Sequence, residues 1–277
     1  MTTVNQMHGI LGQSTHYPKT YAPDILFPIA RSLGREKLAL KDFIGVDYWQ
    51  IFELSWLNPQ GISQVATARL IVPATSEFII ESKSLKLYLN SLNFTIFASV
   101  TNVQKTVEND LSNCLKTTVQ LQIFSLDDDT LKIDKAMGEC LDNIFDDLDK
   151  KVTLTDDVSP ELLSIAKDEY ALQHFHSHLL RSNCPVTNQP DWGTVEVLMD
   201  GLTADKADLL QYILSFRQHN GFHEQCVEQI FSDLTTTYQP KSLMVRAWYT
   251  RRGGIDINPV RVSDESLMPK FSRLVRQ

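Results

Sequence analysis

The sequence predicts an α+β fold built from two tandem modules, and three observations lead to this prediction. The chain has 277 residues, a length that accommodates two domains. The element order strand, strand, helix, helix, strand occurs in the first half and recurs in the second. A faint internal match, between YLNS at residues 88–91 and YILS at residues 212–215, supports a duplication. We therefore predict one module over residues 1–145 and a second over residues 146–277.

Each element of the first half follows from its local pattern. Residues 46–57 and 65–72 are rich in β-formers and flank an Asn-Pro-Gln-Gly turn, which predicts two paired strands. Repeated leucines predict a helix that begins at Ser82 or Ser84 and continues through Leu92. A second helix is predicted over residues 103–115, and an alternating apolar pattern predicts a strand over residues 117–124. Residues 1–25 are interpreted as an arm.

The second half repeats this order after an acidic stretch. Residues 127–157 are interpreted as a linker with some local structure. A strand is predicted to end near Leu180, followed by a turn rich in Pro and Asn. The remaining predicted elements are a strand over residues 192–199, helices over 204–217 and 222–234, and strands over 243–250 and 255–262.

Composition narrows the class of function. The net charge is −8, and no long basic run occurs, which argues against direct nucleic-acid binding and favours a small-molecule ligand. The four cysteines are far apart and do not resemble a disulfide framework. Neither a secretory signal nor an apolar stretch long enough to cross a membrane is found. The expectation is a soluble, cytoplasmic protein with reduced thiols and no membrane partner.

The segment SNCPVTNQPDW (residues 182–192) is the most informative for chemistry. Cys184 follows a predicted strand and opens a loop flanked by prolines, and such loops display side chains at a cleft. Asp191 begins the next strand, and a hairpin return brings it back beside Cys184. A thiol beside a carboxyl group suits nucleophilic catalysis with proton transfer. The alternative is a buried structural cysteine with a turn-forming aspartate.

Two further segments offer groups that suit a purine-like ligand and an anion. His223 and Glu224 open a predicted helix, where Glu224 either accepts the N–H pair of a guanine-like edge or is an ordinary first-turn carboxylate. The segment from Glu81 to Lys86 places two lysines at another helix start, together with that helix's first-turn N–H groups. This is either a phosphate site or a capped amphipathic helix with solvated lysines.

The last polar segment is RRGGIDINP (residues 251–259), a predicted hairpin. Arg252 and Gly253 are candidates for a phosphate clamp, the alternative being a plain turn with exposed charges. The GxGxxG fingerprint is absent, so a Rossmann-type nucleotide site is not expected. His174, His176 and His178 alternate along one predicted strand, but no cysteine or carboxylate nearby in the sequence completes a ligand set. We therefore predict no metal site.

Taken together, these segments resemble one enzyme family. The runs ESKSLKLYLNS, SNCPVTNQPDW, FHE and RRGGIDINP, with LGQSTHYP near the start, resemble the two-module NADPH-dependent 7-cyano-7-deazaguanine reductases over nearly the whole chain. The resemblance implies two tandem tunnelling-fold modules, each an antiparallel sheet backed by two antiparallel helices. It also implies a small-molecule 7-deazaguanine substrate, NADPH as cofactor, a role in queuosine biosynthesis and a homodimer.

The resemblance also implies roles for individual residues at the junction of the modules. Cys184 is the expected nucleophile and Asp191 the expected proton donor. The substrate is expected at Ile80, Glu81, Ser82, His223 and Glu224, and the cofactor at Ser82, Lys83, Arg252 and Gly253. Addition of a thiolate to the nitrile carbon gives a thioimide, which is a better hydride acceptor than the nitrile.

Rival classes of function remain open from the sequence. A nitrile or amide hydrolase would use the same cysteine with water, and a purine- or pterin-binding protein would use the same pocket without chemistry. A relative of the zinc cyclohydrolases would need a metal set that the sequence does not assemble. Cofactor consumption separates a reductase from each of them.

Overall fold

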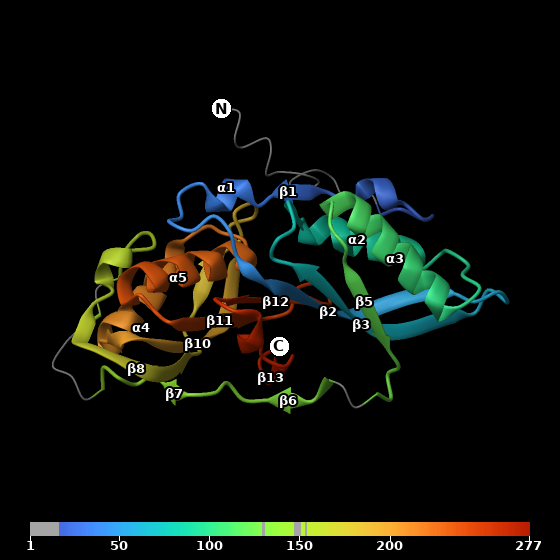
Figure 1. Ribbon diagram of the computed structural model, residues 1–277. Helices are drawn as coiled ribbons and strands as arrows, with labels where there is room; N and C mark the ends of the chain where they lie inside the picture. The colour runs from blue at the N-terminus through green and yellow to red at the C-terminus, as the bar shows by residue number, and fades with distance from the viewer. Residues whose placement is uncertain (1–16, 129–130, 147–150, 153) are drawn as a thin grey trace.

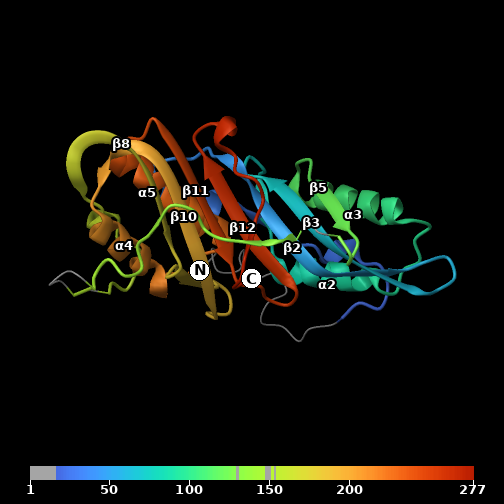
Figure 2. The same ribbon diagram turned by 90° about the horizontal axis from the view of Figure 1, so that it is seen from below.

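One large sheet runs through both halves of the chain, with four long helices on one of its faces (Figures 1 and 2). The computed structural model describes residues 17–128, 131–146, 151–152 and 154–277. Its strand order is β5-β3-β2-β12-β11-β10-β8-β7, with β9 paired to β10. The predicted mixture of helices and strands is confirmed. Among the described residues, no helix has the length and apolar character needed to cross a membrane.

The first half supplies three long strands and two long helices. Its elements are η1 (Pro23–Ile25), β1 (Pro28–Ala30), α1 (Ser32–Arg35), β2 (Ile44–Leu57), β3 (Ser63–Pro73), β4 (Phe78–Ile80), α2 (Ser82–Leu92), α3 (Val100–Leu115) and β5 (Gln120–Phe124). The long elements match the predicted ones to within a few residues. Most of the arm motif LGQSTHYP lies outside the described residues.

The second half supplies four long strands and two long helices. Its elements are η3 (Pro160–Leu162), β8 (Ile165–Ser177), β9 (Arg181–Asn183), β10 (Pro190–Ala204), α4 (Lys206–Ser215), η4 (Phe216–Gln218), α5 (His223–Tyr238), β11 (Ser242–Tyr249), β12 (Ile255–Val262), η5 (Glu265–Leu267) and β13 (Arg273–Leu274). The acidic linker carries the short strands β6 (Ile133–Asp134) and β7 (Glu139–Cys140) and crosses the sheet face opposite the helices (Figure 2).

Two apolar cores lie side by side between the helices and the sheet. In the first, Trp49 and Ile51 of β2 pack with leucines of α2 and α3. In the second, Val195 and Val197 of β10 pack with residues of α4 and α5. Because strand side chains alternate between faces, the intervening residues face the side on which the linker lies. Each helix pair covers mainly the strands of its own half, and Ile255 and Ile257 of β12 also contribute to the first core.

The two halves meet where β2 pairs with β12 in antiparallel register from Ile255 opposite Ile51 to Val262 opposite Ile44. A buried cluster of charges lies at this seam. Arg261 donates to Asp47 at 2.8 Å and to Glu228 at 2.7 Å, so one arginine joins carboxylates from both halves. Buried charges require such pairing, because an isolated one would carry a large desolvation penalty.

Candidate active site

A pocket of about 300 Å³ opens at the seam between the two halves. Its wall combines the start of α2, the loop before β10, the start of α5 and the β11–β12 turn. Every site residue that the sequence analysis named lines this pocket: Ile80, Glu81, Ser82, Lys83, Cys184, Asp191, His223, Glu224, Arg252 and Gly253. The first four come from one half of the chain and the remaining six from the other.

Cys184 lies in a tight loop between β9 and β10. Its backbone N–H donates to the carbonyl of Gln189, and its own carbonyl accepts from the N–H of Asn188, both at 2.9 Å. Asn188 has a φ of 56°, a left-handed conformation that asparagine tolerates better than most residues. The loop therefore closes on itself and holds the half-buried Cys184 against the pocket.

Asp191 is a buried carboxylate that lies between an arginine and a histidine. One oxygen lies 2.9 Å from Nε of Arg252, and the other lies 3.4 Å from Nε2 of His223. The His223 ring stacks on Tyr249 with centroids 3.8 Å apart and planes only 4° from parallel. The hairpin return predicted from the sequence thus delivers Asp191 to the same pocket as Cys184, and its neighbours fix the carboxylate's orientation.

Glu224 is almost fully buried, and its Oε1 has no hydrogen-bond partner among the described residues. Burial, and after it the negative charge of Asp47, raise the pKa of this carboxyl to about 8, against the opposing charge of Arg31. Leaving a buried acceptor unpaired costs about 1–3 kcal/mol. An unpaired carboxylate oxygen facing a pocket is therefore well placed to accept a ligand's N–H groups.

The start of α2 differs from the sequence prediction in its cap. Glu81, rather than Ser82 or Ser84, caps the helix: its carboxylate accepts from the N–H of Lys83 at 2.9 Å and of Ser84 at 2.7 Å. Burial raises the pKa of Glu81, although these two N–H groups oppose the shift. The sequence held one indication of the Glu81 cap, because acidic groups are favoured at helix N-termini.

This cap also changes the expected anion site. Two first-turn N–H groups of α2 are already used by Glu81, so they are not free for a phosphate. The cationic side chains of Lys83, Lys86 and Arg252 remain along the pocket. The chain of Lys86 passes so close to Gly253, which has a φ of 54°, that a β-carbon there would clash with it. The left-handed φ favours glycine, and any side chain there would force the flexible end of Lys86 to move.

Several residues that line the pocket were not predicted to be site residues. Phe222, Gln189, Ile255 and Ile257 belong to the quoted motifs, but no role was predicted for them, and Trp49 and Thr250 lie outside every motif. The aromatic and aliphatic members look like ordinary core residues of strands or a helix start. Only the three-dimensional pairing of β2 with β12 reveals that they also border a ligand-sized space.

Comparison with known proteins identifies the family. Residues 17–123 match the family model described as nitrile reductase, 7-cyano-7-deazaguanine-reductase N-term, and residues 190–267 match the model described as QueF-like protein. Relatives named NADPH-dependent 7-cyano-7-deazaguanine reductase include one from Psychrobacter cryohalolentis, 56% identical over 98% of this chain and 99% of the relative. Relatives of the same name from Psychrobacter arcticus and Acinetobacter baumannii are 54% and 52% identical, covering 98% and 97% of this chain and 99% and 98% of their own lengths.

The resemblance inferred from the four segments is thus confirmed over nearly the whole length of the chain. The pocket geometry and these matches lead to one conclusion: the chain belongs to the family of NADPH-dependent 7-cyano-7-deazaguanine reductases.

Proposed function

We propose that this protein reduces the nitrile of 7-cyano-7-deazaguanine to a primary amine at the expense of two NADPH, within queuosine biosynthesis. The observation that carries this proposal is the convergence of Cys184, Asp191 and the unpaired Glu224 on one pocket. The close relatives that bear the name of this activity support the same assignment.

In the proposed reaction, the Cys184 sulfur attacks the nitrile carbon and the thiol proton passes by way of Asp191 to the nitrile nitrogen. A C–S bond forms, one C–N π-bond is lost, and the product is a covalent thioimide. Arg252 and His223 orient the Asp191 carboxylate for this transfer. Bound NADPH supplies the hydride equivalents for both reductions. Cys184 leaves as thiolate between them, and Asp191 returns protons to nitrogen.

The substrate is proposed to bind with its pyrimidine edge toward Glu224. A carboxylate oxygen without a protein partner accepts an N–H, and two oxygens match the adjacent N–H groups of a guanine edge. His223, Ile80 and the Glu81–Ser82 backbone complete the wall around the ring. Because His223 contacts both Asp191 and the pocket, it also ties substrate position to the proton donor.

The residues along the pocket mouth fit an anionic dinucleotide. Lys83 and Lys86 line the pocket together with Arg252, which also pairs with Asp191, and Gly253 adds a stretch of wall without a side chain beside Lys86. Ser82 is exposed at the start of α2 and offers a hydroxyl. We propose that Ser82, Lys83, Arg252 and Gly253 hold NADPH, and that the 2′-phosphate selects it over NADH.

We further propose that the two halves, residues 1–145 and 146–277, are tunnelling-fold modules. The support is the repeated order of two strands, two helices and further strands, with one helix pair packed on β2 and β3 and the other on β10 and β11. In the described residues the sheet ends at β5 on one side and at β7 on the other. Open edges favour further pairing, which supports a homodimer, and we propose the cytoplasm as its location.

Counting NADPH separates a reductase from a hydrolase that uses the same cysteine. Conversion of a nitrile to an amine takes four electrons, so two NADPH are expected to disappear for each amine formed. Hydrolysis would give an amide or acid and consume none. The measurement is NADPH absorbance against product by chromatography. Product formed without NADPH loss would rule out the proposed function.

Replacing Glu224 with glutamine is expected to weaken substrate binding by about 1.5–3 kcal/mol, because a neutral amide is a poorer and partly mismatched acceptor. The comparison is made by calorimetry above pH 8, where the wild-type group is ionised. Its raised pKa means that the free protein mainly holds Glu224 protonated below pH 8, so binding to the carboxylate form must release a proton. Wild-type affinity should then fall by up to about tenfold per pH unit below this value.

The matched control for this prediction is the pH dependence of the variant itself. Glutamine does not titrate in this range, so Glu224→Gln should lose the part of the pH dependence and of the proton release that Glu224 contributes. Calorimetry in buffers of different ionisation enthalpy measures the released protons directly. Equal affinity and equal proton release in both proteins would remove Glu224 from the substrate site.

A further inference from the structure

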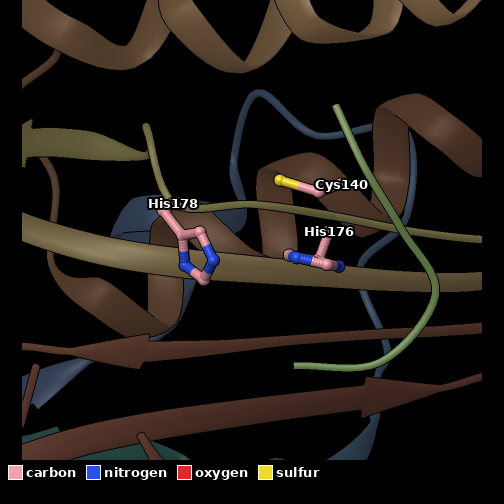
Figure 3. A group of neighbouring side chains, drawn as sticks. All are labelled: Cys140, His176 and His178. Carbon is pink, nitrogen blue, oxygen red and sulfur yellow. The ribbon is translucent and has the colours of Figure 1, made fainter. Parts of the chain in front are cut away.

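A second group of chemically reactive side chains lies on the sheet face opposite the pocket. Cys140 of β7 and His176 and His178, on and just beyond the end of β8, bring ligand atoms within 4.8 Å of one another (Figure 3). Cys140 pairs with His176 in the parallel β7–β8 ladder, which brings the linker alongside the strand. No metal site was predicted at these histidines, because no cysteine or carboxylate nearby in the sequence completes a ligand set, but the fold brings the distant Cys140 beside two of them.

The two imidazole rings are held in a way that suits metal binding. Nδ1 of His176 lies 3.0 Å from the carbonyl of Met137, so this nitrogen carries the proton and donates. Nδ1 of His178 lies 3.0 Å from Oγ1 of Thr194. In His176 the Nε2 lone pair is then available to a cation, and His178 offers the same lone pair when its Nδ1 donates to the Thr194 hydroxyl. Metal-binding histidines usually fix the second nitrogen in this manner, which sets the tautomer and the ring orientation.

The linker reaches this position through contacts of its own. Leu141 is fully buried, and the carboxylate of Asp142 accepts from the Ser177 hydroxyl and the backbone N–H of His178. Glu139 forms an ion pair with Lys206 at 2.7 Å. These contacts surround Cys140 on both sides, so the thiol is presented to the histidines by ordered neighbours. The cluster is therefore largely assembled before any ion arrives.

The donor set is appropriate for a borderline-soft divalent cation. One thiolate and two imidazoles are ligands that Zn²⁺ prefers. In a tetrahedral zinc site the ligand atoms would lie roughly 3.3–3.6 Å apart, from bond lengths of about 2.3 Å to sulfur and 2.0–2.1 Å to nitrogen. The ligand atoms now lie within 4.8 Å of one another, and small rotations of the exposed Cys140 side chain would bring them to the separations of a tetrahedral site. Solvent would provide the fourth ligand.

We propose that Cys140, His176 and His178 form a zinc-binding site that fastens the linker between the two halves to β8. The site lies across the sheet from the pocket, so the metal acts on linker order and on stability, not on the reaction. The proposal does not depend on the assigned enzymatic reaction.

The test titrates chelator-treated protein with Zn²⁺ and counts bound metal by mass spectrometry. One equivalent is expected to bind, to raise the melting temperature and to slow hydrogen exchange in residues 131–146. Replacing Zn²⁺ with Co²⁺ should add a thiolate-to-cobalt charge-transfer band. Binding of Zn²⁺ without protection of residues 131–146 would overturn the fastening role.

Matched variants separate the site from adventitious binding. Cys140→Ser and His176→Gln should each weaken Zn²⁺ binding by more than about 100-fold, since even outer-shell partners of metal ligands are worth about 10–100-fold. Cys114→Ala and His174→Gln, which alter a thiol in α3 and the next histidine along β8, should bind as wild type. Equal affinity in Cys140→Ser and wild type would overturn the site, and NADPH-dependent turnover should be unchanged in Cys140→Ser.

Discussion

Substitution of Cys184 with alanine is expected to abolish both adduct formation and turnover, lowering the rate by more than about 10⁴-fold, as loss of a covalent nucleophile does. The reason is that every later step begins from the proposed C–S bond, and among the described residues that line the pocket no other supplies a thiol. Incubation of the wild type with 7-cyano-7-deazaguanine alone should add the mass of one substrate to the protein. Intact mass spectrometry measures this directly.

The control for this experiment is the neighbouring cysteine of α5. Cys226 is completely buried, and its burial raises the pKa of the thiol to about 12, so it is expected to be unreactive. Cys226→Ala should therefore keep the adduct. An adduct that persists in Cys184→Ala, or disappears in Cys226→Ala while the fold is intact, would refute Cys184 as the nucleophile.

Substitution of Asp191 with asparagine is expected to lower kcat by about 10²–10⁴-fold, the usual contribution of a positioned proton donor. Asparagine keeps the shape of the side chain but cannot carry the transferred proton, and it removes the ion pair with Arg252. Substrate affinity should change much less, because Glu224 is the proposed anchor. Single-turnover kinetics with mass spectrometry separate adduct formation from reduction.

Asp200→Asn provides the matched control for this change. Asp200 lies on the same strand, β10, but outside the pocket, so its substitution should leave turnover near that of wild type. A structural role for Asp191 would lower stability without shifting the pH profile of kcat. If Asp191→Asn lost stability but kept both its turnover and its pH profile, Asp191 would not be the proton donor.

The long elements were predictable because their patterns are local. Periodic leucines marked α2, and a run rich in β-formers beside a turn marked β2. The observed bounds of α2, β2 and β12 lie within two residues of the predicted ones. The Glu81 cap was missed because serine is the commoner signal at that position. The local pattern therefore predicted the type of each of these elements, but it did not predict which residue caps α2.

Features that depend on distant residues were beyond the reach of the sequence. The raised pKa of Glu224 depends on its burial and on Asp47, which belongs to the other half of the chain. The approach of Cys140 to two histidines depends on how an acidic, aperiodic linker docks on β8. The motifs nevertheless contained the residues that meet in one pocket. Each motif is recognisable from its own short run of residues, whichever distant segment it meets in the folded chain.

The seam between β2 and β12 has a consequence for how the chain acquires its catalytic pocket. Arg261 and Asp47, which pair there, are 214 positions apart in the chain. Contacts of such long range are slow to form, because the chain must lose much entropy before they are gained. Each helix pair can pack on its own strands earlier, through shorter-range contacts. Because the pocket takes its wall from both sides of the seam, a chain whose seam has not closed lacks a complete pocket.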